Sequence, residues 1–240
     1  MKEARYFYVP DASITTELPQ DEAIHAIRVL RLQPNDEIFL MDGKGSFYKA
    51  LITLVTNKKC LFHIIETLPQ QPTWIGHIHL AIAPTKMMER MEWMAEKATE
   101  IGFDELSFLN CKFSERTKLR VDRIEKIIVS AVKQSRKAWM PSINDMTGFK
   151  AFVSQPRQGR KFICHCYEEF PKKDFFTEIT TVPDEDITVL IGPEGDFSID
   201  EVQLAINSGY ESVTLGKSRL RTETAGLMAV TMANIARRIP

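Results

Sequence analysis

The feature that most constrains the fold is an alternation of short apolar segments and helical patterns that begins near residue 75. The apolar segments are IHLAIA, ELSFL, KFICH, ITVLI and SVTL, and helical patterns separate most of them. Short, largely apolar runs are typical of strands that are buried on both faces, as in parallel sheets. The sequence therefore predicts an α/β domain with a largely parallel sheet.

Two of the intervening segments have strong helical periodicity. TKMMERMEWMAEKATEIGF has apolar residues at 4-3-4-3 spacing, which predicts a helix that ends at Gly102. Its expected buried face consists of Met87, Met91, Met94, Ala98 and Ile101. In VDRIEKIIVSAVKQSRKAW the expected buried residues are Val121, Ile124, Ile128, Ala131 and either Val132 or Ser135. The opposite face of this second helix carries Arg123, Lys126, Lys133 and Lys137.

The first part of the chain has a different pattern. EIFLMD, FYKALITLV and CLFHIIETL indicate strands, and DGKG has the glycines that a hairpin turn needs. One helix is expected in DEAIHAIRVLRL, with Ile24, Ile27 and Leu30 or Leu32 inward and His25, Arg28 and Arg31 outward. LPQQPTW is typical of a linker. We therefore predict a small β-barrel with a basic helix over residues 1–70 and the α/β domain over residues 71–240.

Composition and charge indicate a folded protein with one basic region. The 240 residues are 44% hydrophobic and 26% charged, with a net charge of −1. MKEARYFYVP lacks the apolar run of a secretory signal, and no stretch approaches the roughly 18 uncharged residues of a membrane span, so we expect a cytoplasmic protein. Residues 111–139 contain nine Lys or Arg against three acids, which indicates either a solvated helix face or a nucleic-acid surface.

The cysteines give no sign of a disulfide framework or a metal site. Cys60, Cys111, Cys164 and Cys166 are irregularly spaced, which favours free thiols in a reducing compartment. Cys164, His165 and Cys166 form a CHC triplet, but no second Cys or His pair lies at a ligand-like spacing. We interpret the triplet as part of a strand and expect no metal.

GPEG, which follows ITVLI, lies between a strand and a strongly signalled helix. Ser198 and Glu201 form a capping box, and Phe197 and Val202 occupy the positions of a hydrophobic staple. The helix is expected to end at Gly209. In an open α/β sheet, ligands bind in the crevice at the carboxyl ends of the strands, and GPEG is expected to lie there.

A second loop of this kind follows the next strand. GKSRLRTETAG comes after SVTL and leads into an apolar helix whose Thr224, Met228, Thr231 and Ile235 share a face. The two loops are expected to end neighbouring elements on one side of the sheet, with polar residues between them: Glu194, Arg219, Arg221, Thr222, Glu223 and Thr224. As an alternative to a ligand site, two ordinary strand-to-helix turns with capping residues explain the same pattern. Neither loop matches the triphosphate motif GxxxxGK[ST].

Several motifs occur in the order in which a known family has them. They are HAIRVLRLQPNDEIFLMDGKG near the start, EKATEIGFDEL and AVKQSRKAWMPSI in the middle, and IGPEG with FSxxE, then LGKSRLRTETA, near the end. The chain thereby resembles the small-subunit ribosomal RNA uridine N3-methyltransferases, the RsmE family of the SPOUT superfamily. The resemblance implies an N-terminal PUA-like β-barrel, a C-terminal α/β domain with a deep trefoil knot, a homodimer and S-adenosyl-L-methionine as methyl donor.

The resemblance also implies the residues of the active site. The expected cofactor-binding residues are Leu190, Ile191, Gly192, Pro193, Gly195, Leu215, Gly216, Leu220, Thr222, Thr224 and Ala225. Attack by uridine N3 requires removal of its proton and stabilisation of charge on the flanking carbonyl oxygens. Glu223 or Glu194 is the expected base, and Arg219 or Arg221 is the expected stabilising cation.

The expected partner is small-subunit (16S) ribosomal RNA in the assembled subunit, with a flexible or flipped-out uridine as target. The expected RNA-binding residues are Arg5, His25, Arg28, Arg31, Ser114, Arg116, Lys118, Lys133, Gln134 and Arg136.

Two other functions are compatible with parts of the sequence. A nucleotide-dependent oxidoreductase also uses crevice loops, but the chain lacks GxGxxG after a first strand. A non-catalytic RNA-binding factor for ribosome assembly explains the basic region and the barrel, but it leaves GPEG and LRTETA without a role.

Overall fold

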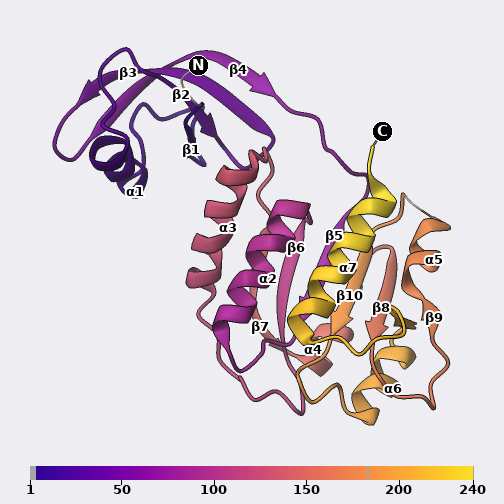
Figure 1. Cartoon of the computed structure of the whole chain (residues 1–240). Coiled ribbons are helices and arrows are strands. Elements are labelled where there is room, and N and C mark those ends of the chain that lie inside the picture. Colours follow the sequence, from indigo (N-terminus) through magenta and orange to yellow (C-terminus); the bar gives the residue numbers. More distant parts are fainter. Residues whose placement is uncertain (1–3, 183, 240) are drawn as a thin grey trace. The chain divides into compact units, whose positions relative to one another are not determined.

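The chain forms two compact units (Figure 1). The computed structural model describes residues 4–182 and 184–239, and the first three residues of MKEARYFYVP lie outside this description. The first unit extends to Pro72 and also includes Val132–Met140, whereas the second contains Thr73–Ala131 and continues from Pro141. A single cut near residue 70 therefore does not separate the units, because a segment from the middle of the chain belongs to the first.

The first unit contains a four-stranded sheet in the order β1-β2-β3-β4. Its strands are β1 (Tyr6–Tyr8), β2 (Glu37–Met41), β3 (Ser46–Val55) and β4 (Cys60–Pro69). β1 pairs in parallel with β2, and the other neighbours are antiparallel. The predicted DGKG turn is confirmed, since Gly43 and Gly45 have positive φ angles of 70° and 108° between β2 and β3. Phe7, Ile38 and Leu40 belong to the buried core of this unit.

The helix predicted in DEAIHAIRVLRL is present, but its winding changes. α1 (Gln20–Ile24) continues as a π-helix, η1 (His25–Val29), in which a turn takes up more residues. Ala23 and Ala26 are therefore buried, and the prediction that Ile24 faces inward is wrong because Ile24 is exposed. Of the other residues predicted to face inward, Leu32 is buried and Ile27 and Leu30 are half-buried. His25, Arg28 and Arg31 are exposed, as predicted.

The second unit contains a seven-stranded sheet in the order β7-β6-β5-β10-β8-β11-β9, and every pair in it is parallel. Its strands are β5 (Ile78–Ile82), β6 (Glu105–Asn110), β7 (Ser142–Gly148), β8 (Arg160–Cys164), β9 (Lys173–Asp174), β10 (Ile187–Ile191) and β11 (Glu211–Thr214). The prediction of a parallel α/β sheet is confirmed. β7 and β9, which the sequence did not predict, form its two edges.

Helices cover the sheet in two groups. They are α2 (Met88–Ile101), α7 (Thr222–Arg237) and α5 (Phe175–Thr180) in one group and α4 (Phe149–Val153) and α6 (Ile199–Asn207) in the other. Successive side chains of β5 point to opposite faces. Leu80 and Ile82 lie near Gly226 of α7, whereas Ala81 and Ala83 share a core with residues of α4 and α6. The central strands are thus buried on both faces, which explains their apolar sequences.

The structure confirms most of the predicted helix faces. In α2, Met91, Met94 and Ala98 are buried, and Gly102 ends the helix with a φ angle of 120°. Met87 precedes the helix and is exposed, so its predicted place in the core is wrong. Ile101 is half-buried.

The helix α3 (Val121–Ser135) matches the second predicted helix. Its buried residues are Ile124, Ile128, Ala131 and Val132, whereas Val121 and Ser135 are half-buried. Between the two alternatives, Val132 is therefore the core residue. No helix in the described part of the chain has the length and apolar character to cross a membrane.

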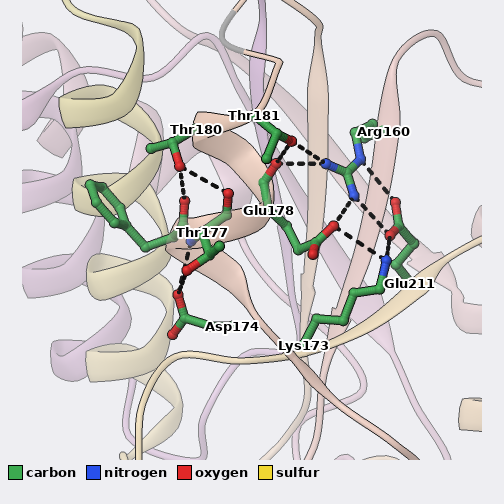
Figure 2. A network of polar contacts seen from close by, with 9 residues as sticks. Arg160, Lys173, Asp174, Thr177, Glu178, Thr180, Thr181 and Glu211 are labelled. Carbon is green, nitrogen blue, oxygen red and sulfur yellow. Dashed lines mark hydrogen bonds and ion pairs between the residues drawn. The ribbon is translucent and has the colours of Figure 1, made fainter.

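A charged network joins the strands at one edge of the parallel sheet (Figure 2). Arg160 of β8 donates hydrogen bonds from Nε and Nη2 to the two carboxylate oxygens of Glu211 in β11, at 2.9 and 2.8 Å. Its Nη2 also contacts Glu178 of α5 at 2.5 Å. Lys173 of β9 pairs with both carboxylates, at 3.1 Å from Glu211 and 3.3 Å from Glu178. The short strand β9 is thereby linked to β11 and α5 by ion pairs as well as by its backbone.

A second polar cluster lies at the amino-terminal ends of β5 and β6. Buried His79 pairs its Nε2 with Ser107 Oγ at 2.8 Å, and Arg157 lies 3.4 Å from its Nδ1. His77 Nε2 is 3.0 Å from Glu105 Oε2. Burial lowers the pKa of His79 to about 4, whereas the hydrogen bond to Glu105 raises the pKa of His77. The two histidines therefore titrate in different pH ranges.

Candidate active site

A cavity of about 790 Å³ opens at the carboxyl ends of three strands of the second unit. We call it the main cavity. Its walls are the segments after β8 (Cys164–Cys166), after β10 (Ile191–Glu194 with Asp196) and after β11 (Leu215–Arg219), together with the start of α7 and Arg90 of α2. Ligands bind at this edge in open α/β sheets, so both predicted loops lie where a ligand site is expected.

The GPEG loop is held in a compact shape by packing and hydrogen bonds. A Cβ atom at Gly192 would lie 3.1 Å from Phe197, which is tighter than most Cβ contacts, so Phe197 would have to shift to admit it. The backbone N–H of Asp196 donates to the Pro193 carbonyl at 2.9 Å, and the side chain of Asp196 accepts from the Cys166 N–H at 2.8 Å. The predicted capping box of Ser198 is present and fixes the helix that follows. These contacts hold the loop in the wall of the cavity, where Gly192 and Pro193 lie beside Glu194 and Asp196.

The LGKSRLRTETA loop forms another wall and is joined to the first. Thr222 donates a hydrogen bond from Oγ1 to the Gly192 carbonyl at 3.1 Å, in a buried position. Gly216 has a φ angle of 130°, a conformation that side chains rarely allow. Arg219 and Arg221 are both exposed and line the main cavity. This wall of the cavity therefore carries exposed cationic groups.

The third wall, from β8, was not predicted as part of the site. β8 lies between β10 and β11, so the expectation that the two loops follow neighbouring strands is wrong.

The side chains of this third wall are uncharged. Burial lowers the pKa of His165, whose Nε2 lies 2.9 Å from Ser212 Oγ, and burial raises the pKa of the Cys164 and Cys166 thiols. These groups are therefore uncharged at neutral pH, and neither thiol is a nucleophile there. Among the described residues no group of His, Cys, Asp or Glu is arranged to bind a metal ion.

Arg90 lies beside both glutamates that were predicted as alternative bases. Its Nη1 is 3.4 Å from Glu194 Oε1, and its Nε is 3.7 Å from Glu223 Oε1. Glu194 Oε2 also accepts a hydrogen bond from the backbone N–H of Lys86 at 3.1 Å, so both of its oxygens have partners. Glu223 is buried, and its Oε2 has no hydrogen-bond partner within the described ranges. Glu194 thus fastens GPEG to the β5–α2 connection, whereas Glu223 retains an unused acceptor.

The sequence contained a signal that points to Arg90. The helix that follows IHLAIA begins at the same edge of the sheet as GPEG, so its first turn faces the crevice. The helical periodicity of the sequence predicted only which residues of this helix are buried, and Arg90 is not one of them.

The predicted cofactor-binding residues divide into two groups. Those that line the main cavity are Ile191, Gly192, Pro193, Leu215, Gly216, Leu220, Thr222 and Ala225. Leu190 is instead buried in the core, Gly195 lies against Phe113, and Thr224 lines a separate cavity. We therefore do not place Leu190, Gly195 or Thr224 in contact with a ligand in the main cavity.

The predicted RNA-binding residues also differ in their surroundings. His25, Arg28, Arg31, Lys118 and Gln134 are exposed. Lys133 is engaged with Glu22, at 2.7 and 2.8 Å from its two carboxylate oxygens, and Arg116 donates to the carbonyls of Thr85 and Lys86. Ser114 Oγ accepts from the Cys111 N–H at 3.0 Å, Arg5 lies 3.8 Å from Asp36, and Arg136 lies over the Tyr6 ring.

Two of these cations thus already have partners within the protein, and the assignment of all ten residues to RNA binding stays a prediction. Lys133 and Arg116 already neutralise or satisfy groups of the protein itself. Lys133, Gln134 and Arg136 also lie in the segment that belongs to the first unit.

The fold and the cavity define a class of protein. It is an α/β protein with a parallel sheet and with a cavity at the carboxyl ends of its strands, where open α/β sheets bind ligands. The chain belongs to the RNA methyltransferase family, whose domain model matches residues 72–234. A second model, described as an RNA methyltransferase PUA domain, matches residues 18–65.

Individual relatives agree with this family over nearly the whole chain. A probable rRNA-methyltransferase from Porphyromonas gingivalis is 40% identical, with a TM-score of 0.88 over 97% of this chain and 98% of that one. Ribosomal RNA small subunit methyltransferase E from Neisseria gonorrhoeae, solved bound to S-adenosyl methionine, is 26% identical, with a TM-score of 0.80 over 95% of each chain. The enzyme of the same name from Mesomycoplasma hyopneumoniae is 29% identical over 87% of this chain and 89% of its own length.

Proposed function

We propose that this protein is an S-adenosylmethionine-dependent methyltransferase that methylates N3 of a uridine in small-subunit (16S) ribosomal RNA. The observation that carries the proposal is the main cavity beside Glu223, Arg221 and Arg90, in a chain whose relatives are methyltransferases of small-subunit ribosomal RNA. A backbone-rich pocket next to a carboxylate and two guanidinium groups suits transfer of a methyl group to a weakly acidic nitrogen.

The main cavity fits the proposed cofactor. The GPEG and LGKSRLRTETA loops offer backbone groups around Gly192 and Leu215, which suit an uncharged, planar adenine. His165 and the two thiols of this wall are uncharged at neutral pH, so they add no charge beside the ring. When bound, the cofactor supplies a methyl carbon on a sulfonium, and the electron pair of the broken C–S bond stays on sulfur.

Glu223 is the favoured base of the two predicted candidates. Uracil N3 carries a proton, so its lone pair becomes available for the new N–C bond only when that proton leaves. Glu223 Oε2 is an acceptor without a partner among the described residues, whereas both oxygens of Glu194 are engaged. Glu223 takes the N3 proton, and Arg221 and Arg90 stabilise the negative charge that spreads to O2 and O4.

Three finer features of the fold belong to this proposal. Membership of the family supports a trefoil knot in the second unit, a PUA-like barrel in the first and a homodimer. Met228 and Ile235 lie on the face of α7 that was predicted from the sequence and that also carries Thr224 and Thr231. Both are exposed apolar side chains that a second copy of the chain would cover. RNA then contacts the exposed His25, Arg28 and Arg31 of the first unit and Lys118 of the second, through phosphates.

The test compares the unaltered protein with Glu223→Gln and Arg221→Ala. Small-subunit ribosomal RNA and assembled subunits are incubated with S-adenosylmethionine, and the methylated nucleotide is mapped by mass spectrometry. The unaltered protein is expected to produce N3-methyluridine, and each variant to lower the single-turnover rate about 100-fold while cofactor affinity is retained.

The matched control for Glu223→Gln is Glu169→Gln, because Glu169 is exposed and lines neither cavity. RNA binding without any methyl transfer by the unaltered protein contradicts the proposal and favours a non-catalytic assembly factor. A wild-type rate in Glu223→Gln contradicts the role of that residue alone.

A further inference from the structure

A second cavity lies beside the main one. Its volume is about 500 Å³, and its lining residues are Glu89, Arg90 and Trp93 of α2 with Arg221, Glu223 and Thr224 at the start of α7. Arg90 and Arg221 line both cavities, so the two spaces adjoin. A ligand in the second cavity is therefore within reach of a ligand in the main cavity.

Trp93 gives the second cavity an aromatic surface. Its side chain is 46% exposed, although its neighbours in sequence, Met94 and Ala95, are buried. A tryptophan kept out of the core beside a cavity offers a face on which a planar ring can stack. Nucleobases use aromatic side chains in this way when proteins bind single-stranded nucleic acid.

The polar groups of the second cavity match one edge of uracil. That edge carries a donor, N3–H, between two carbonyl acceptors, O2 and O4. The second cavity offers one acceptor, Glu223, and two guanidinium donors, since Arg90 Nε lies 3.7 Å from Glu223 Oε1 and Arg221 lines the same cavity. Glu223 Oε2 is buried without a partner among the described residues, and rotation of the carboxylate about its last bond exchanges the two oxygens.

Cytosine does not match this arrangement. Its corresponding edge has a lone pair at N3, which would face a carboxylate, and an amino group, which would face a guanidinium. A buried carboxylate that meets an acceptor is left unpaired, which costs binding free energy. The cavity therefore discriminates between the two pyrimidines by hydrogen bonding.

We propose that the second cavity is the subsite for the target uracil, which stacks on Trp93 and presents N3 to Glu223. This inference rests on the proposed function, because uracil N3 is the atom that the proposed reaction methylates. It adds a substrate-binding residue, Trp93, to the Glu223, Arg221 and Arg90 of the proposed function.

The experiment replaces Trp93 in the full chain. Trp93→Ala is expected to slow single-turnover methylation of ribosomal RNA at subsaturating RNA by about 10- to 100-fold, because stacking on the base is lost. Trp93→Phe retains an aromatic face, and its rate is expected to stay within about fivefold of the unaltered protein. Affinity for S-adenosylmethionine, measured by calorimetry, is expected to be unchanged in both variants.

The matched control is Met87→Ala, because Met87 is also an exposed apolar residue at the start of α2 and lines neither cavity. Its rate is expected to equal that of the unaltered protein. The subsite is overturned if Trp93→Ala methylates at the normal rate, if Phe and Ala slow the reaction equally, or if the loss follows weaker cofactor binding. By contrast, an unaltered protein that transfers no methyl group overturns the proposed function itself.

Discussion

Arg90 is the residue that joins the two predicted glutamates into one site. It contacts Glu194 from the GPEG loop and Glu223 from α7, although the three residues are far apart in sequence. A guanidinium holds two carboxylates through separate nitrogens, which an ammonium on a flexible chain does less well. The activity of the site should therefore depend on the shape of this side chain as well as on its charge.

Replacement of Arg90 tests this dependence. Arg90→Ala is expected to lower the single-turnover rate about 100-fold, since a donor beside the developing charge is lost. Arg90→Lys is expected to recover part of that loss, because it keeps the positive charge but not the planar fork. Equal losses in the two variants would mean that the positive charge contributes nothing without the planar fork, whereas full recovery in Arg90→Lys would mean that the fork is irrelevant. A normal rate in both variants would remove Arg90 from the site.

His79 gives a prediction about pH. Its pKa of about 4 lies below that of an unfolded histidine because it is buried, so in the acidic range the unfolded chain binds a proton that the folded protein does not. The stability that His79 contributes is full above about pH 6.5 and is lost as the pH falls towards 4. His77 acts in the opposite sense and at higher pH, since its pKa is raised and its contribution is lost as the pH rises through that value.

His79→Gln should therefore flatten the dependence of unfolding free energy on pH between about 5 and 6.5, by up to about 1.4 kcal/mol per pH unit. Urea denaturation at a series of pH values measures this slope. His63→Gln is the control, because His63 is exposed, and its slope should match that of the unaltered protein. An unchanged slope in His79→Gln would mean that His79 is not held neutral by the fold.

At the scale of elements, the network around Arg160 holds an edge of the parallel sheet (Figure 2). The side chain of Arg160 is 18% exposed and that of Lys173 is 59% exposed. Loss of the guanidinium leaves the carboxylates of Glu178 and Glu211 close together in a partly buried place, whereas loss of the ammonium removes a mainly exposed partner.

Arg160→Met is accordingly expected to lower the unfolding free energy by about 2 kcal/mol, and Lys173→Met is expected to lower it by much less. Urea denaturation measures both values. If Lys173→Met costs as much as Arg160→Met, the network does not depend on the buried guanidinium.

The sequence predicted the central strands of the parallel sheet but missed its edge strands. ITVLI and IHLAIA form central strands that are buried on both faces, so their apolar runs alone indicated them. β7 was missed because SINDMTG lies at an edge and is mostly polar, and β9 has only two residues. The prediction that Ile24 faces inward was wrong because it assumed the number of residues per turn of an α-helix, which a π-helix changes.

The candidate site shows a similar division. The two glycine-bearing loops were predictable, since strand, turn and cap signals are local in sequence. The wall from β8 and the contacts of Arg90 were not, because they depend on the order of strands and on pairs of residues far apart in the chain. Local patterns thus predicted the loops but not their neighbours.

At the scale of the whole molecule, the outer face of α7 is consistent with the proposed homodimer. Ile235 is 48% exposed and Met228 is 36% exposed on a helix that otherwise packs on the sheet. Ile235→Glu is expected to weaken self-association at least about tenfold, because a charge would be buried in the contact. Sedimentation equilibrium measures the change.

Ile14→Glu is the matched control for this change, since Ile14 is 85% exposed in the first unit. Its association constant should equal that of the unaltered protein. A monomeric unaltered protein, or equal weakening by both variants, would contradict an interface on α7.

The position of β10 between β5 and β8 means that the sheet is completed by a strand that is synthesised late. A nascent chain that ends before β10 has an incomplete sheet, in which β5 has no partner on one side and exposes hydrogen-bonding groups. The loops around the main cavity and the first turn of α7 all come from the last third of the chain. Prematurely terminated chains therefore cannot form the cavity, and ligand binding there distinguishes finished copies from incomplete ones.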